Sequence, residues 1–378
     1  GEIAVIDLDA ALGDGDNRDL VRELVRRHAC RVGGGIRSAD EALDWLDAGA
    51  RSVILGTAAV PEVLDRLPRE RTVAALDAVD GEVVVEGWTA RTGTQVEERI
   101  DALRDHVGGF LLTFVEREGR MQGSDLGRAR ALTERAGPAR VTIAGGITTA
   151  DEIAELDRIG ADAQVGMALY TGTLPLVDAF AAPLRSDRAD GLWPTVVCDR
   201  SGVALGLAYS DRESLERAID TGRGVYRSRS RGLWQKGASS GNAQRLHRVD
   251  LDCDRDTLRF LVEQDGTGFC HRDTWTCFGP SSGVGALERT LAERLANAPA
   301  GSYTRRLLDD PGALAAKLSE EAGELAEARG PDHVAWETAD VLYFAMVAMT
   351  RAGVRFADVE RELDRRARVV RRRSGAPR

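Results

Sequence analysis

Apolar and polar positions in the first 182 residues form short apolar runs separated by longer amphipathic segments. The short runs are typical of buried strands and lie at 3–8, 53–55, 73–76, 110–113, 141–144 and 163–165. The amphipathic segments, such as 39–48 and 150–159, are typical of helices. Strands that alternate with helices predict a parallel α/β sheet, open or closed.

The two halves of this region resemble each other. Residues 34–41 (GGIRSADE) align with 145–152 (GGITTADE), and a further glycine follows the next apolar run of each copy. Glycines at the start of a helix let backbone N–H groups approach a phosphate. The two copies therefore predict two phosphate sites, which include Gly34, Gly35, Gly56, Gly145, Gly146 and Gly166. The alternative is that these glycines only shorten the turns between strands and helices.

From residue 285 the apolar positions recur with helical spacing, as at 287, 291 and 295. The run KLSEEAGEL brings three glutamates together on one helix, and a second helix carries two carboxylates in a mostly apolar stretch. Carboxylates facing each other from two helices are typical of a metal site in a bundle, and oxygen ligands suit Mg²⁺. The alternative is a solvated charged face. The residues are Glu320, Glu321, Glu324, Glu337 and Asp340.

The region between the α/β part and the helical part of the chain carries a different set of candidate ligands. In an extended strand the carboxylates at 250, 252, 254 and 256 would share one face, with Cys253 on the other. Asp252, Asp254 and Asp256 suit Mg²⁺. Three cysteines without a fourth suit a catalytic zinc, which keeps one position for a water that ionises near neutral pH. These cysteines are Cys253, Cys270 and Cys277. The alternative is an acidic surface strand with unrelated buried cysteines.

A run of cations, hydroxyls and glycines precedes these ligands and suits a phosphate cradle. It contains Arg227, Ser228, Arg229, Ser230, Trp234, Lys236, Ser240 and Asn242. Polar segments at 183–190 and 279–283 are typical of linkers. They predict three domains, at 1–182, 188–279 and 285–374.

Composition narrows the function. A net charge of −10 argues against broad nucleic-acid binding, and the basic run 365–373 is interpreted as a solvated helix end. No apolar run is long enough for a membrane span, and no signal peptide is visible at the start. Five cysteines, three of them in a metal-like pattern, favour reduced thiols and a cytoplasmic protein.

Residues 188–279 resemble phosphoribosyl-AMP cyclohydrolase of histidine biosynthesis, on the motifs GLWP at 191–194, SRSR…LW-K-G…SGN, DCD-x-D and CH…C. Ala238 departs from the glutamate usual after Lys-Gly. The resemblance implies zinc on the three cysteines and Mg²⁺ near the substrate phosphate. His271 is the candidate proton shuttle, with a structural histidine as the alternative.

Residues 1–182 resemble the (β/α)₈ barrel of ProFAR isomerase, on VIDLD at 5–9, VGGGIRS at 32–38, GTAA at 56–59 and AGGI at 144–147. The resemblance implies Asp77 as general acid, with Trp88, Thr113, Arg37 and Thr57 at substrate-contacting positions. For Asp77 the alternative is a capping or turn residue. The family's first strand, with its general base, is expected upstream of the first residue. A barrel without this strand would have open sheet edges. Phe114, Glu118 and Met167 also depart from the family pattern.

Residues 285–372 resemble phosphoribosyl-ATP pyrophosphatase, on EExxE, ExxD and the preceding GSYT at 301–304. The resemblance implies Mg²⁺ on the five carboxylates, with Glu320 and Glu321 also among the catalytic residues.

The three resemblances fall on consecutive steps of one pathway, in reverse order along the chain. The sequence therefore predicts a multidomain histidine-biosynthesis enzyme with a TIM-barrel-like domain, a small α+β domain and an all-α bundle. Its substrates would be phosphoribosyl nucleotides, and a homodimer is expected. Two alternatives stay open. In one, only the two hydrolases work and the barrel is a scaffold or binding module. In the other, the chain is a general nucleotide pyrophosphatase with a metal-storing middle domain.

Overall fold

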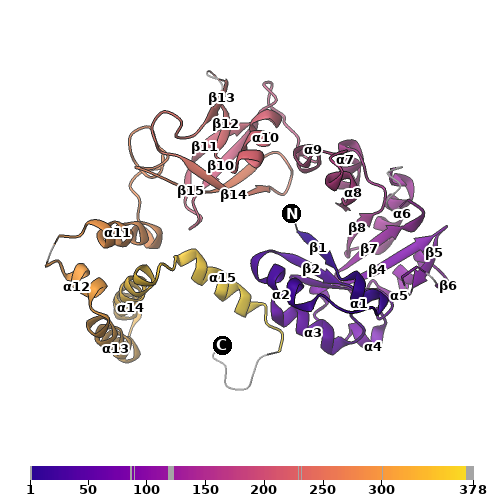
Figure 1. Cartoon of the computed structure of the whole chain (residues 1–378), viewed down its shortest axis with the longest axis horizontal. Coiled ribbons are helices and arrows are strands. Elements are labelled where there is room, and N and C mark those ends of the chain that lie inside the picture. Colours follow the sequence, from indigo (N-terminus) through magenta and orange to yellow (C-terminus); the bar gives the residue numbers. More distant parts are fainter. Residues whose placement is uncertain are drawn as a thin grey trace. The chain divides into compact units, whose positions relative to one another are not determined.

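The computed structural model describes residues 2–371 except residues 86, 89, 118–122, 229, 231 and 300. Arg229 and Glu118 therefore lie outside the described residues. The chain divides into two compact units (Figure 1). One comprises the residues up to Arg185 together with the segment from Arg365, and the other is Ser186–Asp364. None of the described helices is long and apolar enough to cross a membrane.

Among the described residues, seven parallel strands form the main part of the first unit's sheet, which confirms the predicted α/β architecture. They pair in chain order as β1 (Ile3–Ile6), β2 (Cys30–Gly33), β3 (Ser52–Leu55), β4 (Thr72–Val79), β7 (Gly109–Phe114), β8 (Arg140–Ala144) and β9 (Ala161–Gln164). β1 and β9 are the first and last strands of this order. Within the described chain they do not pair with each other, so the sheet is open.

The sequence pattern did not predict the hairpin of β5 (Glu82–Val85) and β6 (Ala90–Gln95), which extends β4 antiparallel. β4 runs three residues past the expected end and turns at Asp80 and Gly81, both with positive φ. Asp-Gly is a favoured pair for such a tight turn. This dipeptide is therefore the signal that could have revealed the hairpin.

Helices cover the sheet and contribute to a single large core. They are α1 (Leu8–Leu12), α2 (Arg18–Arg27), α3 (Ala39–Ala48), α4 (Pro61–Leu64), α5 (Val96–Leu103), α6 (Leu126–Ala136), α7 (Ala150–Arg158), α8 (Met167–Tyr170) and α9 (Leu176–Ala181). Leu46, Ile100 and Leu132 from these helices pack with Phe110 and Ile143 of the sheet. A smaller apolar cluster of alternate strand residues includes Ile54, Val73 and Leu111. Alternate side chains of the strands thus pack in two clusters.

The second unit begins with a four-stranded sheet in the order β11-β10-β15-β14. Its strands are β10 (Trp193–Cys198), β11 (Ala204–Ser210), β14 (Gln244–Leu251) and β15 (Leu258–Gln264). Helix α10 (Arg212–Thr221) and the hairpin of β12 (Val225–Ser228) and β13 (Gly232–Gln235) complete this part. Tyr226 and Phe260 are fully buried and contact each other, so the hairpin and the sheet share one core.

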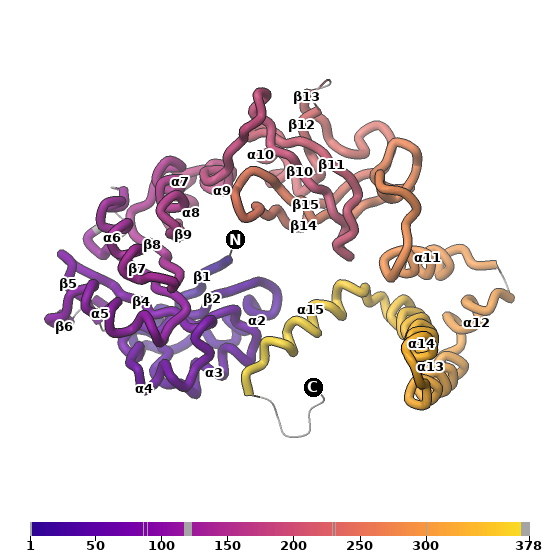
Figure 2. Tube along the Cα trace, turned by 180° about the vertical axis from the view of Figure 1, so that it is seen from behind, coloured from indigo at the N-terminus to yellow at the C-terminus, as the bar shows by residue number. Residues whose placement is uncertain are grey.

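Five helices follow: α11 (Gly283–Asn297), α12 (Tyr303–Asp309), α13 (Pro311–Glu327), α14 (Pro331–Ala352) and α15 (Phe356–Ala367). Helices α13 and α14 lie side by side in both views (Figures 1 and 2). Leu291, Leu307 and Phe344 belong to the hydrophobic core that these helices share. The predicted apolar stripe on α11 is only partly right. Leu291 is buried, whereas Leu295 is 41% exposed, because it lies in the last turn of the helix.

Candidate active sites

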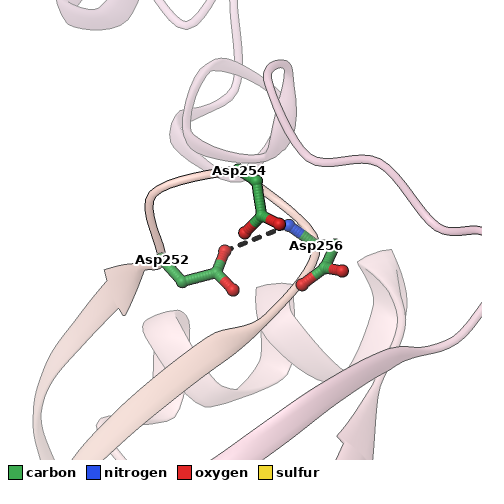
Figure 3. Close-up of side chains that lie close together, drawn as sticks. All are labelled: Asp252, Asp254 and Asp256. Atoms are coloured by element: carbon green, nitrogen blue, oxygen red, sulfur yellow. Dashed lines mark hydrogen bonds between the residues drawn. The ribbon is translucent and has the colours of Figure 1, made fainter.

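A tight turn between β14 and β15 gathers three carboxylates. Asp252 Oδ1 accepts hydrogen bonds from the backbone N–H groups of Asp256 (3.0 Å) and Thr257 (3.1 Å). These bonds bend the chain back on itself, and one carboxylate oxygen each of Asp252, Asp254 and Asp256 lies within 4.8 Å of the others (Figure 3). Such a group of hard oxygen atoms suits a divalent cation.

The expectation of an extended strand through these aspartates is wrong. β14 ends at Leu251, and Arg255 has φ 66°, a turn conformation. Asp250 remains on the strand, where it pairs with Arg248 and Arg259 instead of joining the cluster. Burial acts to raise the pKa of Asp252, but hydrogen bonds from Thr257 and Asp256 hold this pKa below its usual value. Asp252 therefore stays a carboxylate at neutral pH.

Cys270 and Cys277 come together at the ends of one loop. The loop is fixed by hydrogen bonds from Cys270 N to Thr274 O (3.1 Å) and from Cys277 N to Leu205 O (2.8 Å). Hydrogen bonds from the Arg272 backbone and Thr274 lower the pKa of the Cys270 thiol, and Cys277 adds to this effect. Burial raises the pKa of Cys277, and the neighbouring Cys270 raises it further. Cys270 is therefore the readier thiolate of the two.

Cys253 does not join these two thiols. It is exposed, and its sulfur lies 3.9 Å from Asp254 Oδ1. Within the described chain, the three cysteine sulfurs do not form a group of metal-ligand size. His271 is exposed, with Nδ1 4.0 Å from Cys270 Sγ. One copy of the chain thus supplies two neighbouring thiols and an imidazole at this loop.

Gly206 on β11 makes the cysteine loop possible. A Cβ atom there would lie 2.3 Å from the Phe269 ring and 3.3 Å from Cys277 Sγ. Lys236 lies near the same ring, with Nζ 5.3 Å from the centre of the Phe269 ring. Burial lowers the pKa of Lys236 below its usual value, although Cys277 and Cys270 act to raise it. The predicted phosphate-contacting lysine therefore lies beside the thiols.

The other residues of the predicted phosphate cradle have different surroundings. Arg227 is held by two carboxylates, those of Asp211 and Glu213. Asn242 is buried and exchanges hydrogen bonds with Thr267, so it fixes a loop. The remaining described residues are Ser228 and Ser230 near the β12–β13 turn, Trp234 packed on Tyr226, and Ser240 with its hydroxyl accepting from Asn242 N.

A second carboxylate cluster lies between α13 and α14. Oxygen atoms of Glu321, Glu337 and Asp340 lie within 4.8 Å of one another, and both glutamates are 7% exposed. Glu337 Oε1 lies 3.2 Å from His333 Nε2. Glu337 Oε2 is buried and has no hydrogen-bond partner among the described residues. An orphaned buried carboxylate oxygen is costly, and a bound cation would satisfy it.

The two other predicted ligands lie at the edge of this cluster. Lys317 Nζ contacts Glu320 Oε2 (2.9 Å) and Glu321 Oε1 (3.3 Å). Burial raises the pKa of Glu324, and the negative charges of Glu321, Glu337 and Glu320 raise it further. The sequence pattern did not single out Lys317 and His333. Their signal is the spacing of four residues from Glu321 and Glu337.

In the first unit, the predicted general acid and two predicted substrate-contacting residues lie at one edge of the sheet. Trp88 Nε1 donates a hydrogen bond to Asp77 Oδ2 (2.9 Å). Asp77 is the register partner of Thr113 on the neighbouring strand. Both residues lie near the carboxyl ends of their strands, the edge where barrel enzymes place their chemistry. Asp7, which belongs to the VIDLD motif but was given no role in the site, follows β1 at the same edge and is buried.

The repeated glycine turns are also at this edge. Gly34 and Gly35 follow β2, Gly145 and Gly146 follow β8, and all four have positive φ. A Cβ atom on Gly34 would lie 2.2 Å from Asp7 O, so only glycine fits there. Of the other predicted phosphate residues, Gly56 and Thr57 follow β3, Gly166 precedes α8, and Arg37 Nη2 donates to Ala10 O.

Each repeat folds a glutamate back over its turn. Glu41 Oε2 accepts from Arg37 N (2.8 Å), and Glu152 Oε2 accepts from Thr148 N (3.0 Å) and Thr149 N (3.1 Å). Burial acts to raise the pKa of Glu152, but the hydrogen bonds lower it. These amides are therefore occupied by the protein's own carboxylates, and the phosphate role of the glycine turns stays a prediction.

Three family models match successive parts of the chain. Residues 1–175 match "Histidine biosynthesis protein", 206–279 match "Phosphoribosyl-AMP cyclohydrolase", and 284–367 match "Phosphoribosyl-ATP pyrophosphohydrolase".

Curated relatives carry corresponding names. The chain is 45% identical over 190 residues to "Histidine biosynthesis bifunctional protein HisIE" of Deinococcus radiodurans, which covers 45% of this chain and 85% of that protein. It is 52% identical over 202 residues to "Histidine biosynthesis bifunctional protein his7" of Schizosaccharomyces pombe, covering 53% and 48%. It is 37% identical over 348 residues to "Histidine biosynthesis trifunctional protein" of Neurospora crassa, covering 90% and 37%. The chain thus spans less than half the length of the latter two.

Proposed function

Because the chain belongs to the histidine biosynthesis family that joins a cyclohydrolase domain to a pyrophosphohydrolase domain, we propose that it performs two successive hydrolyses. The helical region would convert phosphoribosyl-ATP to phosphoribosyl-AMP and pyrophosphate. The region before it would then open the adenine ring of phosphoribosyl-AMP to give ProFAR. The observation that carries this proposal is the orphaned Glu337 oxygen in a carboxylate cluster buried between two helices.

For the first hydrolysis, Glu321, Glu337 and Asp340 would hold Mg²⁺, with Glu320 and Glu324 at its edge. When bound, the cation supplies positive charge against the triphosphate. His333 orients Glu337 through the contact to its other oxygen. Lys317 holds Glu320 and Glu321 in place and adds a positive charge beside them. The raised pKa of Glu324 makes it a candidate to accept a proton from the attacking water.

For the second hydrolysis, Cys270 and Cys277 would bind zinc, and Asp252, Asp254 and Asp256 would hold Mg²⁺ near the substrate phosphate. When bound, zinc would supply the Lewis acidity that activates water for attack on the purine ring. His271, exposed beside Cys270, would carry protons to and from the ring. Lys236 stabilises the two thiolates by its charge. Because Cys253 is exposed and apart from them, we propose that a second copy of the chain supplies the third cysteine, in a homodimer.

For the barrel-like unit, we propose that Asp77 protonates the opening sugar-ring oxygen of ProFAR and that Trp88 positions it. The alternative is a barrel that binds ProFAR without isomerising it. Mass spectrometry separates the two: purified chain given ProFAR either yields the isomer or leaves ProFAR unchanged. Because the thiols must stay reduced to bind zinc, the proposed compartment is the cytoplasm.

Product analysis with phosphoribosyl-ATP, Mg²⁺ and Zn²⁺ tests both hydrolyses together. Wild type should yield ProFAR or its isomer, Glu337→Gln should leave phosphoribosyl-ATP intact, and Cys270→Ser should accumulate phosphoribosyl-AMP. Intact phosphoribosyl-ATP with the wild type, alongside hydrolysis of deoxynucleoside triphosphates, would instead favour a general nucleotide pyrophosphatase.

A further inference from the structure

A cavity of about 450 Å³ lies at the end of the first unit's sheet that is opposite to Asp77. Its walls come from the amino-terminal ends of β2, β3, β4, β7 and β8, as Arg31, Ser52, Val73, Gly109 and Arg140 show. Barrel enzymes keep their chemistry at the carboxyl ends of the strands. This cavity is therefore separate from the proposed isomerase site.

The lining of the cavity is strongly basic in a chain whose net charge is −10. Two acidic residues, Glu2 and Glu70, face the five arginines. Among the lining residues alone, positive charge is therefore in excess by three, and Asp162, which does not line the cavity, also pairs with Arg140. The arginines are Arg31, Arg51, Arg71, Arg140 and Arg368. Clefts lined by one sign of charge concentrate ligands of the opposite sign.

Part of this lining already holds a carboxylate. Glu2 contacts Arg31, lies 2.5 Å from Arg51 Nε through Oε1, and lies 3.6 Å from Arg140 Nη1 through Oε2. Arg31 is 9% exposed, and its Nη1 donates to Thr142 Oγ1 (2.9 Å). The guanidinium is therefore fixed before any ligand arrives. The carboxylate of Glu2 thus already binds these arginines in the way that an oxyanion ligand would.

The rest of the lining holds two arginines, Arg71 and Arg368, that form no ion pair with a carboxylate among the described residues. Arg71 donates to Ala50 O (2.7 Å), Arg51 O (3.1 Å) and Arg368 O, so its position is set by backbone carbonyls. Burial lowers the pKa of Arg71, the nearby charge of Arg368 lowers it further, and the carboxylate of Asp47 acts to raise it. No carboxylate among the described residues forms an ion pair with Arg368. Two close like charges beside a cavity are stabilised by an anion between them.

We propose that this cavity binds a small multivalent oxyanion, of the phosphate or pyrophosphate class, between Arg71, Arg368 and Arg140. Arginine is suited to this ligand because its planar guanidinium donates paired hydrogen bonds to phosphate oxygens. Arg368 belongs to the segment that Asp47 fastens to α3 by accepting from Val370 N (2.7 Å) and Arg371 Nε (2.9 Å). A bound anion would therefore also secure this segment on the first unit.

Isothermal titration calorimetry on the full chain tests the proposal, with pyrophosphate and inorganic phosphate as probes. EDTA excludes metal-dependent binding at the carboxylate clusters. A constant ionic strength excludes changes in affinity that come from general charge screening. We expect saturable binding that Arg368→Glu weakens by about tenfold or more, because a charge-assisted contact becomes a repulsion. Tighter binding of pyrophosphate than of phosphate would mean that two phosphate groups are held, and equal binding would mean one.

Arg130→Glu is the matched control, since it makes the same charge change at an exposed position of α6 in the same unit. It should bind the probes as the wild type does. Arg140→Gln gives a second test should Arg368→Glu not fold, which thermal unfolding without anion would show. Equal affinity of the wild type, Arg368→Glu and Arg140→Gln would overturn the proposal, and so would the absence of saturable binding. Neither result depends on the hydrolase activities.

Discussion

The guanidinium of Arg289 stacks on the indole of Trp275, with 4.0 Å between its central carbon and the ring centre. Arg289 is on α11, the first helix of the pyrophosphohydrolase region, and Trp275 is two residues from Cys277. Trp275 Nε1 donates to Asp199 Oδ2 (2.8 Å), and Arg289 Nη1 lies 3.6 Å from the same oxygen. One proposed hydrolase thus supports the cysteine loop of the other.

Replacing Arg289 should therefore affect the two hydrolases unequally. In Arg289→Ala, we expect ProFAR formation from phosphoribosyl-AMP to fall about two- to tenfold, the range of a partly desolvated cation–π contact. Pyrophosphate release should stay within about twofold, since Glu321 and Glu337 lie on other helices. Arg289→Lys keeps the charge and loses the planar group, so its rate of ProFAR formation should lie between those of the wild type and Arg289→Ala. Equal losses in both assays would indicate general destabilisation instead.

Glu337→Gln should lower the rate of pyrophosphate release and raise the free energy of unfolding of the metal-free protein. Glu337 Oε2 is buried without a hydrogen-bond partner among the described residues, whereas the amide N–H group of a glutamine could donate to the two neighbouring carboxylates. We expect the metal-free variant to unfold with about 1 kcal/mol more free energy than the wild type. Its pyrophosphate release should fall at least about a hundredfold. Magnesium should raise the melting temperature of the wild type but not of the variant.

Glu320→Gln is the matched control for this pair of measurements, because Glu320 is exposed and contacts Lys317 at the edge of the cluster. Its metal-free stability should change by less than about 0.5 kcal/mol. A stability gain as large as that of Glu337→Gln would contradict the special position of Glu337.

Glu263 should make the second unit sensitive to acid. Burial acts to raise its pKa, but Arg245, Arg355 and His247 lower this pKa to about 2. Because the folded pKa is depressed, the stabilisation is complete above the unfolded value near 4.5 and disappears as pH falls toward 2. Screening limits the contribution at neutral pH to about 1–2 kcal/mol. Urea unfolding of Glu263→Gln should show this loss at pH 7 and almost none at pH 2. A pH-independent difference would mean that packing, not charge, is responsible.

Gly206→Ala should disturb the cysteine loop specifically. The added methyl group would lie 2.3 Å from the Phe269 ring, so the loop must move. We expect zinc content, measured by atomic absorption, to fall by more than half, with a loss of stability of about 1–3 kcal/mol. Gly127→Ala on α6, where the nearest atom is 3.6 Å away, should leave zinc unchanged and stabilise its helix. Full zinc content in Gly206→Ala would show that the loop tolerates the change.

Local patterns in the sequence predicted the elements whose causes are local. Ser38 and Thr149 begin α3 and α7 where the repeat placed them, because each side chain accepts a hydrogen bond from the helix's third residue. Helical spacing likewise predicted Glu321, Glu337 and Asp340, which the fold brings together. These features need only the order of residues along one or two helices.

Features that depend on distant partners were missed or misjudged. The sequence placed Arg227 in a phosphate cradle, but two acidic residues from the α10 region hold it. The aspartates at 252–256 were expected on a strand, yet a hydrogen-bonded turn gathers them. The arginine-lined cavity carries no sequence signal, since its residues are spread from β2 to the segment after α15. Such sites arise from tertiary folding, which periodicity does not report.

The two proposed hydrolase regions are joined by a short segment around residue 280, within one compact unit. A ribosome that makes one region therefore also makes the other. Cells that carry this chain cannot adjust the ratio in which the two regions are synthesised through separate promoters. If both are active, the balance between the two steps is set by their rate constants, so selection on one step acts on the expression of both.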